Sequence, residues 1–255
     1  MDRLTLDSFD LREYSTQDQS QLLSLWCKVF GDPPKLVETF FHLLPEMGTC
    51  CVAAKDTQIL GAAYLIDGFT LLVPGQPPRR CGYLYAVAVH EQFRGEGIGA
   101  AVSREAASLG FGRGADLICT LPAEDSLYRW YEKTLSLNSI CTRRRRTMEQ
   151  LPSAAKPLSV TEYLSRREFI LSGTPHTALN SAAMEFQQCL CETYGGGLYA
   201  CGTSIFCAYR DGDHWVIPEV LPVSANLQTD AADVSPYLCS DVPLPDELVW
   251  NLTFD

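Results

Sequence analysis

No stretch of the 255-residue sequence contains the ~20 consecutive apolar residues that a membrane-spanning helix needs. The N-terminus, Met1-Asp2-Arg3, also lacks a basic segment followed by an apolar run, so the sequence predicts no secretory signal. Basic residues are few: 20 lysines and arginines stand against 31 acidic residues, and the net charge of −11 argues against nucleic acid as the main partner. These absences predict a cytoplasmic protein that binds neither membranes nor nucleic acid.

Recognisable metal-ligand spacings are absent as well. The closest cysteine pairs, Cys50-Cys51 and Cys189-Leu190-Cys191, lack the two-residue gap of paired zinc ligands. The four histidines share no ligand spacing either; they are His42, His90, His176 and His214. No metal is therefore expected. Because the sequence has 11 cysteines, an odd number, and no export signal, buried free thiols are expected rather than a disulfide framework.

A glycine-rich bend between a predicted strand and a predicted helix is the most informative feature that is present, at Gly82–Ala101. Gly95, Gly97 and Gly99 allow backbone N–H groups to approach an anion without a Cβ atom in the way. The helix that is predicted to begin at Ile98 adds the positive end of its dipole. The bend therefore predicts binding of a phosphate-bearing ligand.

Two other phosphate-binding loops fit this bend less well. A Walker loop needs Gly-Lys-Ser/Thr, which does not follow the glycines. Gly95, Gly97 and Ala100 satisfy the dinucleotide fingerprint G-x-G-x-x-G/A, but that fingerprint has its first glycine directly after the strand, and His90–Arg94 intervene here. Asp116, at about the position of the ribose-binding acid, precedes an apolar run and does not end one. A dinucleotide-dependent oxidoreductase stays open as an alternative function.

Hydrophobic periodicity and turn residues indicate a mixture of helices and strands. The first part predicts a helix with Leu22, Leu25, Trp26, Val29 and Phe30 on one face, a helix over Lys35–Leu44, and strands over Cys50–Ala54, Ile59–Ile66 and Phe69–Val73, the last two separated by a turn at Asp67-Gly68. After the glycine bend come a strand over Ala115–Leu121, a helix over Ser126–Leu135 and a strand over Ser139–Met148. The last part predicts helices from the capping box Ser159/Glu162 to Leu171 and from Thr174 to Tyr194. Strands follow over Leu198–Cys201, Ile205–Arg210 and His214–Leu221, with a hairpin turn at Asp211-Gly212-Asp213.

Three parts of this sequence, in the same order, resemble the GCN5-related N-acetyltransferases, the GNAT family. Gln92–Gly97, QFRGEG, resembles the family's Q/R-x-x-G-x-G/A loop, which holds the pyrophosphate of acetyl-CoA. Leu84–Val89 is similar to the family's central strand, and Leu127–Lys133, LYRWYEK, is similar to its Tyr-x-Lys helix. The Gly-Phe that usually ends that helix reads Ser136-Leu137 in this sequence.

The resemblance implies acetyl-CoA as the cosubstrate and identifies the residues that would bind it. Backbone groups of the central strand would hydrogen-bond the pantetheine arm, and the loop with the start of the next helix would hold the pyrophosphate. The implied residues are Val87, Ala88, Val89, Arg94, Gly95, Glu96, Gly97, Ile98, Gly99 and Ala100.

The resemblance also implies the fold and the domains. The fold class is α+β: a GNAT fold with a central mixed, largely antiparallel sheet flanked by helices, followed by a second, smaller, degenerate GNAT-like domain, as in the two-domain Eis-like members of the family. We expect a catalytic, acetyl-CoA-binding domain over residues 1–150, a proline-containing linker over 151–157 and the second domain over 158–255.

The expected chemistry is direct attack of a primary amine on the thioester of acetyl-CoA. An alkylammonium has a pKa of about 10, so a base must take its proton, and a proton donor helps the thiolate to leave. Tyr131 is the predicted donor, because a phenol is protonated at neutral pH and the family resemblance places this tyrosine beside the sulfur; Tyr128 is the alternative. Glu91 is one candidate base. The carboxylate of Asp255 is another, since the chain end reaches the catalytic centre in Eis-like proteins.

The sequence does not specify the acceptor. A polyamine, an aminoglycoside, an amino acid or a peptide amine all fit, although the net charge of −11 favours a cation. The second domain is expected to shape the acceptor pocket or a homodimer interface. Arg143–Arg146, the one basic run, is expected on a solvated strand edge. A non-catalytic acyl-CoA-binding regulatory protein, in which Tyr131 has no role, stays open as a second alternative.

Overall fold

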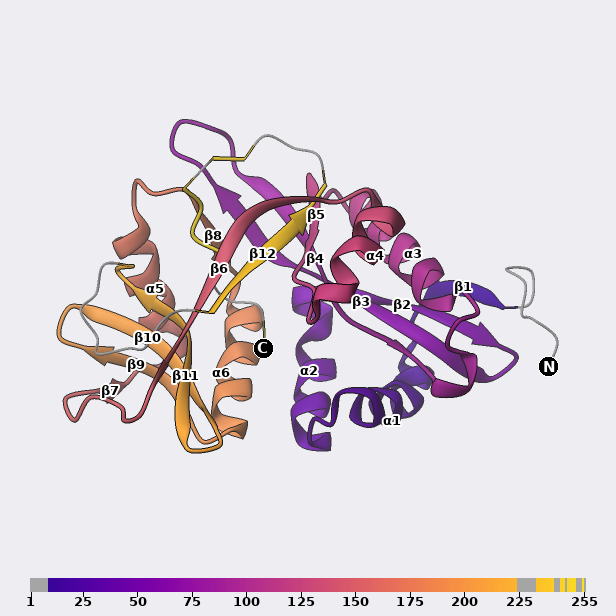
Figure 1. Ribbon diagram of the computed structural model, residues 1–255, viewed down its shortest axis with the longest axis horizontal. Coiled ribbons are helices and arrows are strands. Elements are labelled where there is room, and N and C mark those ends of the chain that lie inside the picture. Colours follow the sequence, from indigo (N-terminus) through magenta and orange to yellow (C-terminus); the bar gives the residue numbers. More distant parts are fainter. Residues whose placement is uncertain (1–8, 224–232, 241–243, 246, 251–253, 255) are drawn as a thin grey trace. The chain divides into compact units, whose positions relative to one another are not determined.

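The computed structural model describes residues 9–223, 233–240, 244, 245, 247–250 and 254 (Figure 1). The chain divides into two compact units. The first unit comprises Met1–Phe69, Arg79–Asn138 and Leu238–Val242, and the second comprises Thr70–Pro78, Ser139–Tyr237 and Pro243–Asp255. The predicted domain boundaries at 150 and 158 stay a prediction. No helix in the described part of the chain is long and apolar enough to cross a membrane.

The first unit is a mixed sheet with helices on its faces. Its strands are β1 (Asp10–Glu13), β2 (Gly48–Lys55), β3 (Gln58–Leu72), β4 (Arg79–Val89), β5 (Leu117–Thr120) and the end of β12 (Asp233–Cys239), in the order β1-β2-β3-β4-β5-β12. β4 and β5 pair in parallel, whereas β1 with β2, β2 with β3 and β5 with β12 are antiparallel. The helices are α1 (Gln19–Phe30), α2 (Pro34–Met47), α3 (Ile98–Gly112) and α4 (Asp125–Leu135). The predicted α+β class is confirmed.

Two apolar layers hold these helices to the sheet. The layer under α1 and α2 is aromatic: Trp26 is 1% exposed, and its ring centroid lies 4.7 Å from that of Phe40 and 4.9 Å from that of Tyr64. The layer under α3 and α4 contains small side chains such as Cys51 and Ala53. Because β2 is buried on both faces, its sequence GTCCVAAK shows no alternation of apolar and polar residues.

The predicted turn at Asp67-Gly68 is wrong, because β3 runs without interruption from Gln58 to Leu72. Gly68 is not among the glycines with the positive φ that many tight turns require. The Asp67 carboxylate instead lies 3.5 Å from Nε of Arg113 and 3.9 Å from Nη2 of Arg80. A typical turn residue therefore serves as an ion-pair partner inside a long strand.

The second unit has a sheet of its own. Its strands β6 (Asn138–Met148), β7 (Lys156–Pro157), β9 (Gly197–Cys201), β10 (Ser204–Asp211) and β11 (His214–Leu221) lie in the order β6-β11-β10-β9-β7, and β8 (His176–Leu179) lies outside that order. Helices α5 (Val160–Leu171) and α6 (Ser181–Thr193) pack against β9 and β10. Gly212 has a φ of +59° and Asp211 pairs with His214, so the predicted hairpin turn is confirmed.

The helix predicted from Thr174 to Tyr194 starts too early. Its first residues form β8, and α6 begins after Asn180, whose side chain accepts a hydrogen bond from the backbone N–H of Ala183 at 2.9 Å. β8 is extended because it pairs with β3, and the Thr177 N–H also donates to the carbonyl of Val249 at 3.1 Å. A partner so distant in the sequence leaves no local signal.

A charged pair is fully buried in the second unit. Arg167 of α5 is 0% exposed and Glu219 of β11 is 1% exposed. Nε and Nη2 of Arg167 donate to the two carboxylate oxygens of Glu219, at 3.1 Å each. The Tyr163 hydroxyl donates to the same carboxylate at 3.0 Å, and Nη1 of Arg167 donates to the Thr177 carbonyl at 2.6 Å. Both charges therefore have the hydrogen-bond partners that a buried ion pair requires.

His176 of β8 is held in surroundings that favour the imidazolium form. Its Nε2 lies 3.0 Å from Oε2 of Glu168, and its Nδ1 lies 2.7 Å from the Thr174 carbonyl oxygen. The other carboxylate oxygen of Glu168 accepts a hydrogen bond from Nη1 of Arg167. Both neighbours of the ring accept hydrogen bonds, so both ring nitrogens must carry hydrogen. Burial alone would lower the pKa of His176, but the hydrogen bonds with Glu168 and Thr174 outweigh it and raise the pKa.

We expect the second unit to lose stability as the pH rises through this raised pKa. The stabilisation of the folded unit by the protonated His176 ring is complete below the unfolded-state pKa of about 6.5. It is lost above the folded-state pKa, because folding stabilises the protonated ring. Urea titrations at several pH values measure the free energy of unfolding. His176→Gln should flatten the fall of the unfolding free energy with rising pH. His214→Gln, which changes an exposed histidine of the same unit, should leave that fall unchanged. An unchanged decline in His176→Gln would contradict the assignment.

Candidate active site

Two glycines of the predicted phosphate loop have the backbone conformation that glycine favours. Gly95 has a φ of +84° and Gly97 a φ of +81°. A Cβ atom at either position would meet no described atom within 4 Å. Gly97 is the N-cap of α3, and no described side chain caps this helix end or places an acid in its first turn. The first N–H groups of α3 are therefore left for an anion.

The loop is anchored to the strands that precede it. The His90 N–H donates to the carbonyl of Leu60 in β3 at 2.9 Å. Nε of Arg94 donates to the carbonyl of Val89, the last residue of β4, at 3.3 Å. Between these contacts lies the 3-10 turn η3 (Glu91–Phe93). The guanidinium of Arg94 thus lies at the base of the loop, where its positive charge favours a phosphate.

Gly61 of β3 was not singled out by the sequence analysis, but it lets α3 approach the sheet. A Cβ atom at Gly61 would lie 2.8 Å from Cγ2 of Ile98 and 3.0 Å from the carbonyl oxygen of Ala88. A side chain there would push the start of α3 away from β4 and displace the phosphate loop. The signal that could have found this residue is a glycine in the middle of an apolar strand.

β4 and β5 separate beside the predicted pantetheine-binding residues. Their parallel pairing ends with Tyr83 opposite Cys119, and β5 itself ends at Thr120. β4 continues to Val89, and Ala86, just before residues 87–89, has a φ of +48°, which is uncommon for a residue other than glycine. The carbonyl of Leu84 still accepts a hydrogen bond from the Thr120 side chain of β5 at 2.9 Å. At residues 87–89 the described β5 has already ended, and the backbone of β4 there can pair with an extended ligand.

Tyr131 of α4 is a buried phenol in this region. It is 7% exposed, and burial raises its pKa to about 12, so the hydroxyl is protonated at neutral pH. Thr120, the last residue of β5, lowers the pKa of Tyr131 against this larger effect of burial. The ring packs against Trp130 with a centroid distance of 4.7 Å, and Trp130 in turn lies 3.7 Å from a Cβ atom placed at Gly99. α4 thus packs beside α3, the helix that begins at the phosphate loop (Figure 1).

The structure describes one of the two predicted bases. Glu91 is exposed, and its carboxylate lies 2.6 Å from Nζ of Lys28 in α1. The hydrogen bond from Lys28 lowers the pKa of Glu91, which makes Glu91 a weaker base. Asp255 lies outside the described residues; its neighbour Phe254 is buried in the second unit, with its ring centroid 5.2 Å from that of Phe186. The base role of Glu91 and of Asp255 stays a prediction.

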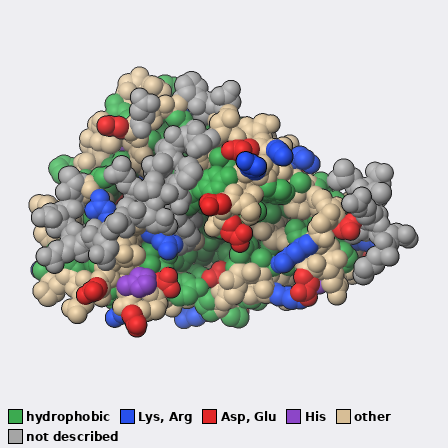
Figure 2. Space-filling view, viewed as in Figure 1, with side chains coloured by type: hydrophobic (Ala, Val, Ile, Leu, Met, Phe, Trp, Pro, Cys, Tyr) green, Lys and Arg blue, Asp and Glu red, His purple; other side chains and the backbone are tan. Residues whose placement is uncertain are grey.

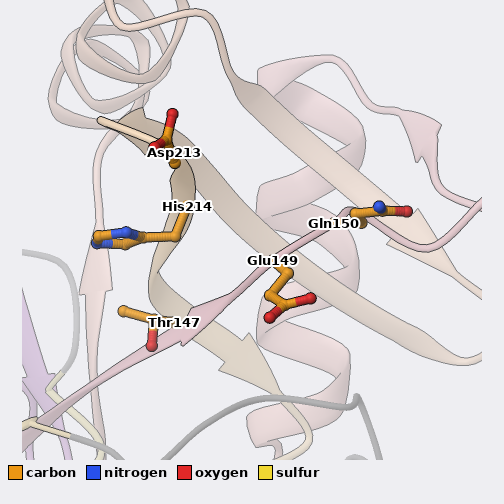
Figure 3. A pocket seen from close by; sticks show the side chains of 5 residues that line it. All are labelled: Thr147, Glu149, Gln150, Asp213 and His214. Carbon is orange, nitrogen blue, oxygen red and sulfur yellow. The ribbon is translucent and has the colours of Figure 1, made fainter.

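A separate pocket of about 570 Å³ lies in the second unit (Figure 3). It is lined by residues at the end of β6 and at the β10–β11 turn, which are Thr147, Glu149, Gln150, Asp213 and His214. The side chains of His214 and Gln150 point in opposite directions (Figure 3). In the described parts of the chain, no group of three or more His, Cys, Asp and Glu side chains is placed to hold a metal ion. None of the residues that line this pocket belongs to the predicted site.

The mixed sheet, the glycine loop ahead of α3 and the buried phenol of α4 define the class of protein, an acyltransferase. Residues 10–132 match the family model described as the acetyltransferase (GNAT) domain. This part of the chain is a GNAT domain, so the resemblance to the GCN5-related N-acetyltransferases found in the sequence is confirmed. Acetyl transfer, with acetyl-CoA as the donor, is the general activity that this family supports.

Solved structures show the same fold over most of the chain. The GCN5-related N-acetyltransferase from Kribbella flavida has a TM-score of 0.64 at 14% identity, covering 92% of this chain and 72% of that chain. The one from Anabaena variabilis has a TM-score of 0.62 at 13% identity, covering 91% and 72%. Eis1 from Mycobacterium abscessus has a TM-score of 0.60 at 12% identity, covering 85% and 59%. A search of curated proteins found no match.

Proposed function

We propose that the first unit transfers the acetyl group of acetyl-CoA to a primary amine by direct attack of the amine on the thioester. One arrangement carries the proposal: the phosphate loop at the start of α3 lies next to α4, which holds the protonated phenol of Tyr131. A phosphate site alone would support binding only. A protonated acid beside it adds the group that a thiolate leaving group needs.

The residues of the first unit fit acetyl-CoA. Backbone groups from Gly95 to Ala100, together with the charge of Arg94, would hold the pyrophosphate, because this stretch combines positive-φ glycines with an uncapped helix start. The backbone of residues 87–89 would pair with the pantetheine arm where β4 has separated from β5. When bound, acetyl-CoA supplies the thioester and its acetyl group.

In this proposal Tyr131 acts as the general acid. As the new C–N bond forms and the C–S bond breaks, the phenol hydrogen passes to the departing sulfur. The attacking nitrogen must also lose a proton, and Glu91 and the carboxylate of Asp255 are the candidates to accept it. Exclusion of water around a residue that is 7% exposed strengthens the electrostatic effect of the phenol on the developing thiolate.

The charge of the protein bears on the class of acceptor. The net charge of −11 favours an approaching cation, such as a polyamine or an aminoglycoside. On the face shown in Figure 2, however, acidic and basic side chains are interspersed. We therefore propose a primary amine as the acceptor and leave its size to experiment.

Release of free thiol from acetyl-CoA, measured across a panel of polyamines, aminoglycosides, amino acids and lysine peptides, tests this function. We expect acceptor-dependent release for at least one class, with the acetylated amine as product. Binding of acetyl-CoA without turnover of any amine would contradict the proposed reaction and favour a regulatory acyl-CoA-binding protein.

A matched pair of glycine variants tests the cosubstrate site. Gly97 and Gly31, the C-cap of α1, both have a φ of +81°, and a Cβ atom at either position meets no described atom within 4 Å. Gly97→Val and Gly31→Val therefore impose similar backbone strain, but only the first adds a side chain at the proposed pyrophosphate site. Calorimetry should show a dissociation constant for acetyl-CoA that rises about tenfold or more, ~1.4 kcal/mol, in Gly97→Val alone. Equal affinities in the two variants would place the phosphate elsewhere.

A further inference from the structure

We infer that Trp130 of α4 is a positioning residue for Tyr131: its indole packs against the phenol ring on one side and against Gly99 of α3 on the other. This inference rests on the proposed function of Tyr131 as the general acid. Trp130 immediately precedes the Tyr-x-Lys motif and is not part of it. Its role is to fix where the ring of the acid lies.

The indole of Trp130 meets the ring of Tyr131 in an edge-to-face contact. The two ring centroids are 4.7 Å apart and the ring planes are inclined at 80°, an arrangement that aromatic pairs favour. Adjacent side chains of a helix do not normally face each other, so this contact requires the indole to turn across the helix surface toward the phenol. The position of the phenol ring therefore depends on what holds the indole on its other side.

The support on that other side is the first turn of α3. A Cβ atom at Gly99 would lie 3.7 Å from Cζ2 and 3.9 Å from Cη2 of Trp130. These are ordinary contact distances, so a longer side chain at this position would need the space that the indole occupies. The backbone of α3 at Gly99 thus forms the surface on which the six-membered ring of Trp130 lies.

The same glycine places the indole near the end of β4. A Cβ atom at Gly99 would also lie 3.5 Å from Cγ2 of Val89. Val89 and the indole of Trp130 are therefore both within 4 Å of one point, at the strand end where residues 87–89 are proposed to bind the pantetheine arm. The residue that supports the acid thus lies beside the proposed position of the cosubstrate.

A second attachment holds α4 beyond Tyr131. Nε of Arg104 in α3 donates to the carbonyl of Thr134 at 3.3 Å. The phenol, which is 7% exposed, therefore lies between two points at which α4 is attached to α3. An acid held in this way keeps a fixed position relative to the start of α3, where the pyrophosphate is proposed to bind.

Replacement of the indole tests the inference. Trp130→Leu removes the aromatic ring and keeps an apolar side chain, whereas Trp130→Phe keeps an aromatic ring. We expect Trp130→Leu to lower kcat for thiol release by about tenfold or more, because a small displacement of a reacting group is costly, with little change in KM for acetyl-CoA. Trp130→Phe should keep most of the rate. Trp215→Leu, which removes a partly buried indole from the second unit, is the matched control and should leave kcat unchanged.

Double variants separate positioning from general packing. In the Tyr131→Phe background, Trp130→Leu should cause no further loss of kcat, because it acts through the phenol hydroxyl. Gly99→Leu adds a side chain that competes with the indole for space. The loss of kcat that it causes should be smaller in the Trp130→Leu background than in the wild type. Equal losses from Gly99→Leu in these two backgrounds would overturn the contact between Trp130 and Gly99.

An equal fold-loss of kcat from Trp130→Leu in the wild type and in Tyr131→Phe would overturn the inference and leave Trp130 a structural role, while the proposed function would stand. A wild-type kcat in Trp130→Leu, with or without a rise in KM for acetyl-CoA, would overturn it as well. A failure of Tyr131→Phe to lower kcat would instead overturn the proposed function, and the inference with it. If Trp130→Leu does not fold, as judged by its thermal unfolding, Trp130→Met replaces it in the same comparisons.

Discussion

Replacement of Tyr131 by phenylalanine is expected to lower kcat for acetyl transfer by about 10²–10⁴-fold, the range that general acid–base catalysis contributes. The variant keeps the ring, which packs 4.7 Å from Trp130, and removes only the hydroxyl. Folding and acetyl-CoA binding should change little, so KM for acetyl-CoA should stay nearly constant. Initial rates of thiol release at saturating acceptor measure both quantities.

Tyr128→Phe is the matched control, because Tyr128 lies in the same helix and is partly buried against the same apolar cluster. It should keep nearly the full rate. Since burial raises the pKa of Tyr131 to about 12, the phenol stays protonated through neutral and mildly alkaline pH, and the loss in Tyr131→Phe should be the same throughout that range. A large loss in Tyr128→Phe with none in Tyr131→Phe would assign the acid to Tyr128 and contradict the assignment made here.

Glu219→Gln is expected to destabilise the second unit by about 3–5 kcal/mol, the usual cost of removing one partner of a buried ion pair. The guanidinium of Arg167, which is 0% exposed, would lose the carboxylate that accepts from its Nε and Nη2 at 3.1 Å each. The Tyr163 hydroxyl would lose its charged acceptor as well. The free energy of unfolding from urea titration measures the effect.

Two further variants distinguish the effect of breaking the buried ion pair from the effect of removing any charge. Glu149→Gln removes an exposed carboxylate from the same unit and should change the free energy of unfolding by less than about 0.5 kcal/mol. Arg167→Met combined with Glu219→Leu should recover part of the loss, because no buried charge is then left without a partner. If Glu219→Gln unfolds at the same urea concentration as the wild type, the pair does not support the second unit.

Much of the first unit could be predicted because its signals are local. The glycine loop is recognisable from Gly95 and Gly97 since both need positive φ, and α1 shows its buried face directly as Leu22, Leu25 and Trp26. The GNAT resemblance rests on such short segments in a fixed order, and the family match over residues 10–132 confirms it. The hairpin at Gly212 was predictable for the same reason.

Predictions were wrong where a distant partner outweighs a local preference. Thr174-Pro175 favours a helix start, yet the following residues form β8 because they pair with β3, which comes much earlier in the sequence. Asp67-Gly68 favours a turn, yet β3 continues through it while Asp67 pairs with Arg113, which comes much later in the sequence. In both cases the deciding contact cannot be seen within a window of neighbouring residues.

The sequence by itself showed the resemblance to the GNAT family and predicted the phosphate loop and the candidate acid, because these depend on residue type and short spacing. Only the tertiary structure decided that Gly61 lets α3 approach β4 and that the Thr120 hydroxyl donates to the Leu84 carbonyl. The pairing of Arg167 with Glu219 was decided in the same way. The physical reason is that steric approach, desolvation and hydrogen-bond direction are properties of groups that meet only after the strands and helices have packed.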